Sequence, residues 1–296
     1  KIDWLIKNKR LKDLETLLML NPAAGKEKKV IKLLVNEYLS SSDIRSACEK
    51  MNSLSKDAQS NYLDKFLIYC LIHQDRKDEA QLILELLKER GFKDNFFNDK
   101  INFLLGLKEN TSQKIKDDNL LNFYLSHITV KDFSYKPNEK TDKYIWRYLS
   151  SANLIKTTDF DNEEVILTYE KAAAENSIGR DEIFKIYKQI LFSVDQLINA
   201  REVYKNLPNF KARALIYQSI LLSDVIEKKL YLAFLLKNLF EKDNISNAYS
   251  KELLSILNNI DSKEIPDSYE NLVTQVLEKG IIISKKKIKF DNDVLH

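Results

Sequence analysis

Glycine and proline are scarce in this sequence, at 5 and 4 residues among 296. β-Sheets whose strands are joined by tight turns use more of both, because glycine supplies positive φ angles and proline presets the turn. The shortage therefore predicts helices joined by short polar loops. Hydrophobic residues make up 44% of the chain and charged residues 31%, a balance that permits a buried core and excludes a mainly disordered chain.

An excess of charge of one sign is also missing. Lys and Arg number 47 against 44 Asp and Glu, which gives a formal net charge of +3. Charges of opposite sign alternate along the predicted helices, as in Lys77-Asp78-Glu79. Proteins that bind nucleic acid usually concentrate basic residues on one face, so this pattern disfavours nucleic acid as a partner.

The sequence has no long apolar run. Its densest stretch, Leu230 to Phe240, is broken by Lys237 and Asn238, whereas a membrane-spanning helix needs roughly 20 mostly apolar residues. We therefore expect a chain that does not span a membrane. Because the sequence begins without Met, we also expect a processed form or a fragment of a longer protein.

Apolar residues recur with a helical period of 3.6 along almost the whole chain, which predicts an all-α fold. Several predicted helices begin at residues that can cap them by accepting from free backbone N–H groups. These predicted caps are Ser42-Asp43, Asp94, Asp161, Ser193 and Asp267.

The predicted helices follow one another in pairs. In residues 62–90 an apolar stripe ending at Cys70 leads into a polar turn, and a second stripe begins at the small residue Ala80. Residues 210–240 repeat this arrangement. Such pairs bury their apolar faces only by stacking on neighbours, so we predict a superhelical stack of antiparallel helix pairs. The pattern resembles a tetratricopeptide-like α-solenoid, although the 34-residue signature of that repeat does not recur.

The helical pattern is weakest between about Thr129 and Lys140, where Pro137 interrupts it. We therefore predict an N-terminal subdomain of helical hairpins over residues 1–128 and a linker over 129–141. A C-terminal subdomain of helical hairpins is predicted over 142–280, followed by a basic tail over 281–296 that contains Lys285, Lys286 and Lys287.

Two stretches are similar to a group of alphaproteobacterial helical-repeat proteins of unassigned function, which are sometimes mislabelled as antifreeze glycopeptide polyproteins. The resemblance rests on Ala47-Cys48, Phe66 to Cys70, Ala80, Leu86 to Gly91, Phe97, Gly106, Phe192 to Leu197 and Ala212 to Gln218. It covers about two-thirds of the chain. These are helix-packing motifs. The resemblance implies an exported protein of the bacterial envelope without known chemistry, and a cytoplasmic protein is the alternative.

The two cysteines, Cys48 and Cys70, lie on consecutive predicted helices. Counting residues from a turn near 54–57 offsets them by roughly 10 Å along antiparallel helices, beyond the reach of a disulfide. An uneven turn could close that gap, and an exported protein favours a disulfide. Each cysteine alone is also typical of a small buried hydrophobic residue.

Catalytic, cofactor-binding and metal-binding patterns are not found. The sequence lacks the Cys and His spacings of zinc sites and a glycine-rich phosphate loop. Paired carboxylates such as Asp117-Asp118 and Glu163-Glu164 fall in first helical turns, where they complement the helix dipole. We therefore predict that the chain is not an enzyme and carries no cofactor.

Tyrosine and phenylalanine number 14 each. Four aromatic residues beside the predicted linker, Tyr135, Tyr144, Trp146 and Tyr148, are of the kind that anchor interfaces, although core packing is the alternative for each. We therefore predict a non-catalytic scaffold that binds a protein or peptide near this junction. A helical accessory region of a larger, lytic transglycosylase-like cell-wall enzyme is the alternative, and a helical repeat that binds nucleic acid is disfavoured.

Overall fold

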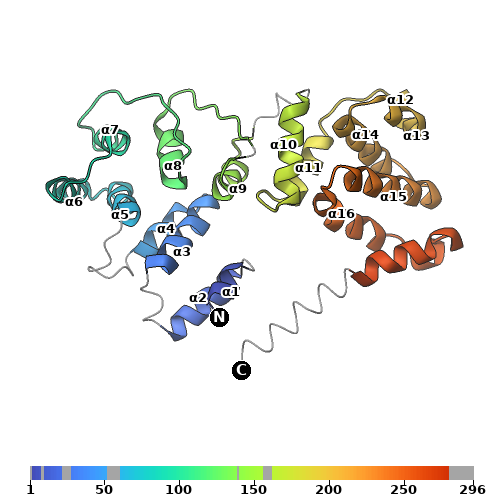
Figure 1. The fold of residues 1–296 in the computed structure, drawn as a ribbon, viewed down its shortest axis with the longest axis horizontal. Coiled ribbons are helices and arrows are strands. Elements are labelled where there is room, and N and C mark those ends of the chain that lie inside the picture. Colours follow the sequence, from blue (N-terminus) through green and yellow to red (C-terminus); the bar gives the residue numbers. More distant parts are fainter. Residues whose placement is uncertain are drawn as a thin grey trace. The chain divides into compact units, whose positions relative to one another are not determined.

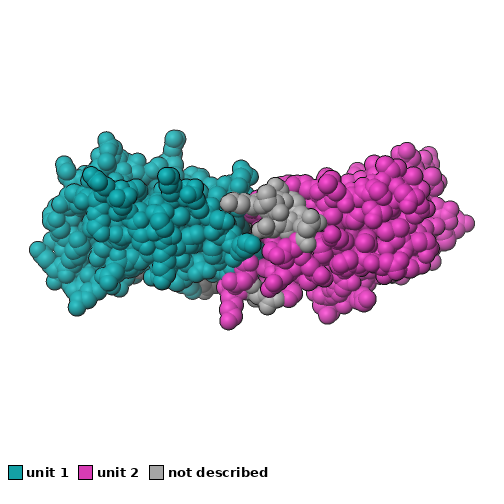
Figure 2. All heavy atoms as spheres, turned by 90° about the horizontal axis from the view of Figure 1, so that it is seen from above, with its two compact units in different colours: residues 1–136, 141–154 teal, residues 137–140, 155–296 magenta. Residues whose placement is uncertain are grey.

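The computed structural model describes residues 2–7, 10–21, 28–51, 61–138, 140–155 and 162–279. Of these residues, 72% are helical, and none lies in a strand. The prediction of an all-α fold is therefore confirmed. The chain divides into two compact units, which Figure 2 colours teal and magenta.

Unit 1 comprises residues 1–136 and 141–154. Its helices pack as pairs of chain neighbours, with α3 against α4 and α5 against α6 (Figure 1). The elements are α1 (Ile2–Lys7), α2 (Leu11–Leu20), α3 (Lys28–Ser40), α4 (Ile44–Met51), α5 (Asn61–His73), α6 (Lys77–Glu89), α7 (Asn95–Leu104), α8 (Leu120–Thr129) and α9 (Lys143–Ser151).

Unit 2 comprises residues 137–140 and 155–296. Its central helix α14 packs against both α11 and α15, and α10 packs against α16. The elements are α10 (Glu163–Ala174), α11 (Arg180–Tyr187), α12 (Val194–Ile198), α13 (Ala200–Val203), η3 (Tyr204–Asn206), α14 (Asn209–Leu221), α15 (Ile226–Lys242), α16 (Ser246–Asn258), η4 (Ser262–Glu264) and a further helix over residues 267–279.

A recurring turn explains how the chain folds with so little glycine. Among the described residues, five helix ends close on a residue other than glycine with φ between 53° and 60°: Ser42, Asp75, Asn153, Asn176 and Asn244. At each end, the next residue donates its N–H to a carbonyl five residues back, as in Arg76 to Leu71 at 2.8 Å. This is the Schellman motif, and Asn, Asp and Ser tolerate its left-handed position better than most residues. The same turn joins α3 to α4, α5 to α6 and α15 to α16.

Helix starts follow the predicted caps at Asp43, Asp94 and Ser193, and Asp43 accepts from the N–H of Ser46 at 3.0 Å at the start of α4. Asp94 accepts from the N–H of Phe97 at the start of α7, and Ser193 forms a capping box with Gln196 at the start of α12. Asp161 lies outside the described residues, and α10 is capped by Asn162. The prediction for Asp267 is wrong, because this residue is the first of the helix over residues 267–279 and does not precede it.

The boundary between the units differs from the predicted one, because α9 belongs to unit 1. On α9, Ser151 donates its hydroxyl proton to the carbonyl of Ser40 at 2.7 Å, and Arg147 pairs with Glu37 of α3. Much of the predicted linker also packs on unit 1, since the Tyr135 ring lies 4.8 Å from that of Phe123. The main division falls near residue 155 instead, and only residues 137–140 of the predicted linker group with unit 2.

Aromatic side chains fill the core of each unit. In unit 1, a series of edge-to-face contacts runs from Tyr69 to Tyr124, from Tyr124 to Tyr148 and from Tyr148 to the buried Phe123. In unit 2, a similar group is formed by Phe184, Tyr187, Tyr217, Phe240 and Tyr249. Core packing therefore accounts for much of the high aromatic content. Within the described ranges, every helix is too short or too polar to cross a membrane.

Candidate interaction surfaces

The structure places two of the four predicted contact residues in the core. Trp146 and Tyr148 are each only 3% exposed, because the apolar face of α9 packs against α3 and α8. Tyr148 also shares a hydrogen bond of 2.8 Å with Nδ1 of His127. The prediction that these two residues contact a partner is therefore wrong, since a buried side chain offers no surface.

Tyr135 and Tyr144 are partly buried and are held by acidic neighbours. Tyr135 donates its hydroxyl proton to Asp117 at 2.6 Å, and burial together with this carboxylate raises the pKa of Tyr135 to about 12. Burial, with the negative charge of Glu37, likewise raises the pKa of Tyr144 to about 12. Both rings pack against other residues of unit 1, so the four aromatic residues do not form one exposed site.

The structure joins Cys48 and Cys70 in a disulfide, with their Cα atoms 5.4 Å apart. The predicted offset of roughly 10 Å is therefore wrong. It rested on a count from a turn near residues 54–57, which lie outside the described residues. Both cysteines are buried, so the bond lies inside unit 1 and links α4 to α5.

Residues 105–119 join α7 to α8 without regular structure, and polar contacts hold this connection to both helices. On α7, the carboxylate of Asp99 accepts from Lys108 Nζ at 2.8 Å, Thr111 Oγ1 at 2.6 Å and the Ser112 N–H at 2.8 Å. These donors hold the pKa of Asp99 well below its usual range. Long irregular connections are uncommon in compact domains and are often functional, so this one is a candidate site.

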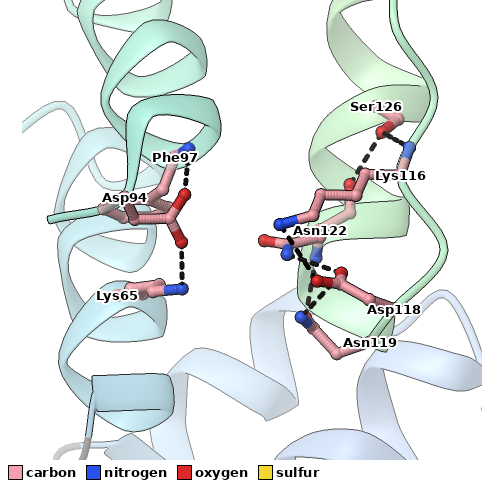
Figure 3. Close-up of polar contacts among 8 residues, drawn as sticks. All are labelled: Lys65, Asp94, Phe97, Lys116, Asp118, Asn119, Asn122 and Ser126. Atoms are coloured by element: carbon pink, nitrogen blue, oxygen red, sulfur yellow. Dashed lines mark hydrogen bonds and ion pairs between the residues drawn. The ribbon is translucent and has the colours of Figure 1, made fainter.

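Figure 3 shows where the connection meets α8. Asp118 accepts from Lys116 Nζ at 3.0 Å and Asn122 Nδ2 at 2.7 Å. Asn119 caps α8 by accepting from the N–H of Asn122, and the Lys116 N–H donates to Ser126 Oγ at 3.0 Å. The side chains at this end of the connection therefore bind one another and α8.

On the neighbouring helices of Figure 3, Lys65 pairs with Asp94 at 2.5 Å. Burial alone would raise the pKa of Asp94, but the hydrogen bonds from Lys65 and the Phe97 N–H outweigh it and lower the pKa. The buried Lys100 donates to the carbonyl of Ser112, and burial lowers its pKa. Each of these charged groups is already bound within unit 1, so the cluster is best understood as a support for the connection.

Unit 2 has a feature of a different kind, six exposed aliphatic side chains on two segments that lie next to each other. We call it the α12–α14 apolar surface. Their exposed fractions lie between 48% and 94%. Its members are Leu191, Val194, Ile198, Leu221, Leu222 and Val225.

Hydrogen bonds hold the two segments that form this surface next to each other. Gln218 on α14 donates to the carbonyls of Tyr187 and Ile190, at 2.6 and 2.7 Å. The next residue, Ser219, donates its hydroxyl proton to the carbonyl of Leu197 at 3.1 Å. The segment containing Leu191 to Ile198 is therefore fixed to the end of α14, immediately before Leu221 and Leu222. Helical periodicity did not reveal this surface, because α12 is only one short turn and α14 is buried along most of its length.

Unit 2 also contains a buried charge network that the sequence did not indicate. Arg213 donates from Nε and a terminal nitrogen to Glu170, at 2.9 and 2.5 Å, and it also binds Asp243. The hydroxyl of Tyr187 donates to Glu170. Burial would lower the pKa of Arg213, but Glu170, Tyr187 and Asp243 outweigh it and keep the guanidinium charged. With all these groups bound to one another, the network supports packing.

Among the described residues, no group of three His, Cys, Asp or Glu side chains is arranged to hold a metal ion. A comparison with known families matches the MA3 domain to residues 27–132, which is less than half of the chain and lies within unit 1. The MA3 domain is an all-α helical-repeat domain for protein interaction and is typically non-catalytic. No curated protein and no solved structure matches this chain. The match supports the predicted class of helical-repeat protein.

Proposed function

We propose that this chain is a non-catalytic helical-repeat scaffold that binds a protein or peptide partner in the bacterial cell envelope. The helical pairs of both units and the similarity of residues 27–132 to a protein-interaction domain support the scaffold role. The alternative, a helical accessory region of a larger cell-wall enzyme, would use the same kind of binding.

The observation that carries the proposal is the α12–α14 apolar surface. A partner that covers these six aliphatic side chains gains roughly 25 cal/mol of binding free energy for each Å² of apolar area that it removes from water. Grouped exposed apolar residues on soluble proteins commonly mark a binding site. The hydrogen bonds from Gln218 and Ser219 hold the surface in place, so binding requires little ordering of the chain.

The envelope location is supported by the disulfide between Cys48 and Cys70. Disulfides persist in oxidising compartments such as the bacterial periplasm and are rare in the cytosol. The resemblance to exported alphaproteobacterial helical-repeat proteins favours the same location.

The partner can be found by photo-crosslinking from the full chain inside cells. A benzophenone amino acid at Leu222 is expected to capture a defined protein. The same group at Leu82, an exposed leucine of α6 in unit 1, serves as the matched control and is expected not to capture it.

The captured protein is then purified and its affinity measured. The variant Leu191→Ser, Ile198→Ser, Leu222→Ser is expected to bind it at least about tenfold more weakly with an unchanged melting temperature, because interface energy concentrates in a few apolar anchors. Equal capture from both positions, or unchanged affinity in the triple variant, would contradict the proposal.

A further inference from the structure

The α12–α14 apolar surface carries charge of only one sign among its apolar residues. Asp195 lies between Val194 and Ile198, and Asp224 lies between Leu222 and Val225. Residues 191–198 and 221–225 contain no Lys or Arg. Both carboxylates are on exposed residues, and neither forms an ion pair within the part of the chain that the structure describes. Asp195 accepts one hydrogen bond, from Asn199 Nδ2 at 2.9 Å. A partner that covers the apolar residues must therefore meet two carboxylates.

The backbone around this surface offers little to a partner that binds by main-chain hydrogen bonds. Gln218 already occupies the carbonyls of Tyr187 and Ile190, and Ser219 occupies that of Leu197. The start of α12 is closed by the capping box of Ser193 and Gln196. An extended peptide, whose own backbone needs partners, is therefore disfavoured against a helix, whose backbone groups bond internally.

A second copy of this chain is a poor occupant of the same surface. In a twofold dimer, each surface meets its own equivalent. Residues 191–198 and 221–225 of the other copy carry no Lys or Arg that could pair with Asp195 and Asp224. Such a dimer therefore brings together surfaces of like charge, which costs several kcal/mol at an interface.

From these observations, and resting on the proposed function, we propose that the α12–α14 apolar surface binds an amphipathic helix with Lys or Arg bordering its apolar face. The aliphatic side chains of the helix cover Leu191, Ile198 and Leu222, and its cations pair with Asp195 and Asp224. The formal net charge of the chain is +3, so general attraction does not favour a cationic ligand. Selectivity for Lys or Arg must come from these two carboxylates.

The test uses the full chain and synthetic helical peptides of about 18 residues, followed by fluorescence anisotropy. The probe places leucine along one face with lysine at its borders. A second peptide has glutamate in place of each lysine, and a third has the composition of the probe in an order without a helical face. We expect binding of the lysine probe, and binding of both other peptides weaker by at least about tenfold.

Two variants separate this inference from the proposed function. Asp195→Asn with Asp224→Asn removes the charges and keeps the shape, and we expect about 3- to 10-fold weaker binding of the lysine probe, with a smaller dependence on salt. The apolar variant Leu191→Ser, Ile198→Ser, Leu222→Ser is expected to show no measurable binding of the lysine probe.

If the apolar variant loses the captured partner but the two Asn substitutions change nothing, the scaffold function stands and this inference fails. The inference also fails if the glutamate peptide binds equally well, or if the unmodified chain does not bind the lysine probe. It fails as well if sedimentation shows a dimer that the apolar variant abolishes, because the occupant is then a second copy.

Discussion

The two units fix their helices by different means. In unit 1, a disulfide joins α4 to α5, and contacts such as Lys65–Asp94 and Arg147–Glu37 are partly open to water. Unit 2 contains no cysteine. Its helices α10 and α14 are joined by the buried pair of Glu170 and Arg213, which α11 completes through Tyr187. A covalent bond stabilises chiefly by restricting the unfolded chain, whereas a buried ion pair depends on every partner being present in the folded state.

The candidate sites of the two units also differ, since one is polar and the other apolar. Unit 1 has a long irregular connection, and Asp99, Asp118 and their donors hold it against the helices. Both units expose single aliphatic side chains, such as Leu82 in unit 1. In unit 2, however, Leu191, Ile198 and Leu222 lie on two segments that hydrogen bonds from Gln218 and Ser219 hold together. The polar side chains of the connection are occupied in holding it to α7 and α8, whereas the exposed apolar side chains of unit 2 remain for a partner to cover. This difference places the proposed binding site in unit 2.

The largest effect is expected from breaking the buried network of unit 2. Arg213→Met keeps much of the side-chain volume but leaves Glu170 buried without its cation. We expect a loss of about 3–5 kcal/mol in the free energy of unfolding, measured by chemical denaturation followed by circular dichroism.

Removing both charges distinguishes the cost of an unpaired carboxylate from a general packing defect. The double variant Arg213→Met, Glu170→Leu is expected to recover much of the lost stability, because a well-packed apolar pair often replaces a buried ion pair without loss. The exposed ion pair Lys205–Glu202 supplies the control, and Lys205→Ala is expected to leave the unfolding midpoint unchanged. A single Arg213→Met variant as stable as the unmodified chain would show that the pair does not hold unit 2 together.

Much of the fold could be predicted from the sequence, because apolar spacing of 3.6 residues is repeated over many helices. The hairpin of residues 62–90 corresponds to α5 and α6, with Ala80 buried where the helices approach. The unit boundary could not be predicted in the same way. Pro137 interrupts the local pattern, but α9 packs back on α3, which is more than 100 residues away in the sequence.

The candidate sites were harder to predict, since burial depends on neighbours that are distant in sequence. Trp146 has the side chain of an interface residue, and only the packing of α9 shows that it is in the core. Glu170 looks like one of many carboxylates on a helix surface until Arg213 is placed opposite it. The exposed aliphatic residues Leu191 and Leu222 look like core residues in the sequence.

An intermediate effect is expected from removing the disulfide of unit 1. The variant Cys48→Ala, Cys70→Ala opens a loop with a sequence separation of 22 residues. The relation between loop length and the entropy of the unfolded chain gives a loss of about 3 kcal/mol in the free energy of unfolding. Dithiothreitol is expected to lower the unfolding midpoint of the unmodified chain similarly and to have no effect on the variant. Two thiols alkylated in the unfolded, unreduced chain would contradict the disulfide and remove its support for an envelope location.

The smallest effect is expected at the connection of unit 1, where Asp99 binds three donors from residues 108–112. These hydrogen bonds hold the pKa of Asp99 below its ordinary value of 3.8, so the folded state favours the charged carboxylate. A lowered folded-state pKa stabilises the protein above the ordinary value, and this contribution is lost as the pH falls through the folded-state pKa.

Asp99→Asn removes the charge while keeping the size of the side chain, and it tests whether the connection depends on that charge. At pH 7 we expect it to lower the free energy of unfolding by less than about 1 kcal/mol, since the contacts are partly exposed to water. The difference from the unmodified chain should be constant between pH 7 and 5. It should shrink as the pH falls below 3.8, because Asp99 of the unfolded chain is protonated there while the folded state still holds it charged. Glu109→Gln, on the same connection, is the control for a general loss of negative charge. A difference that does not change with pH would show that the shape of the side chain, and not its charge, holds the connection in unit 1.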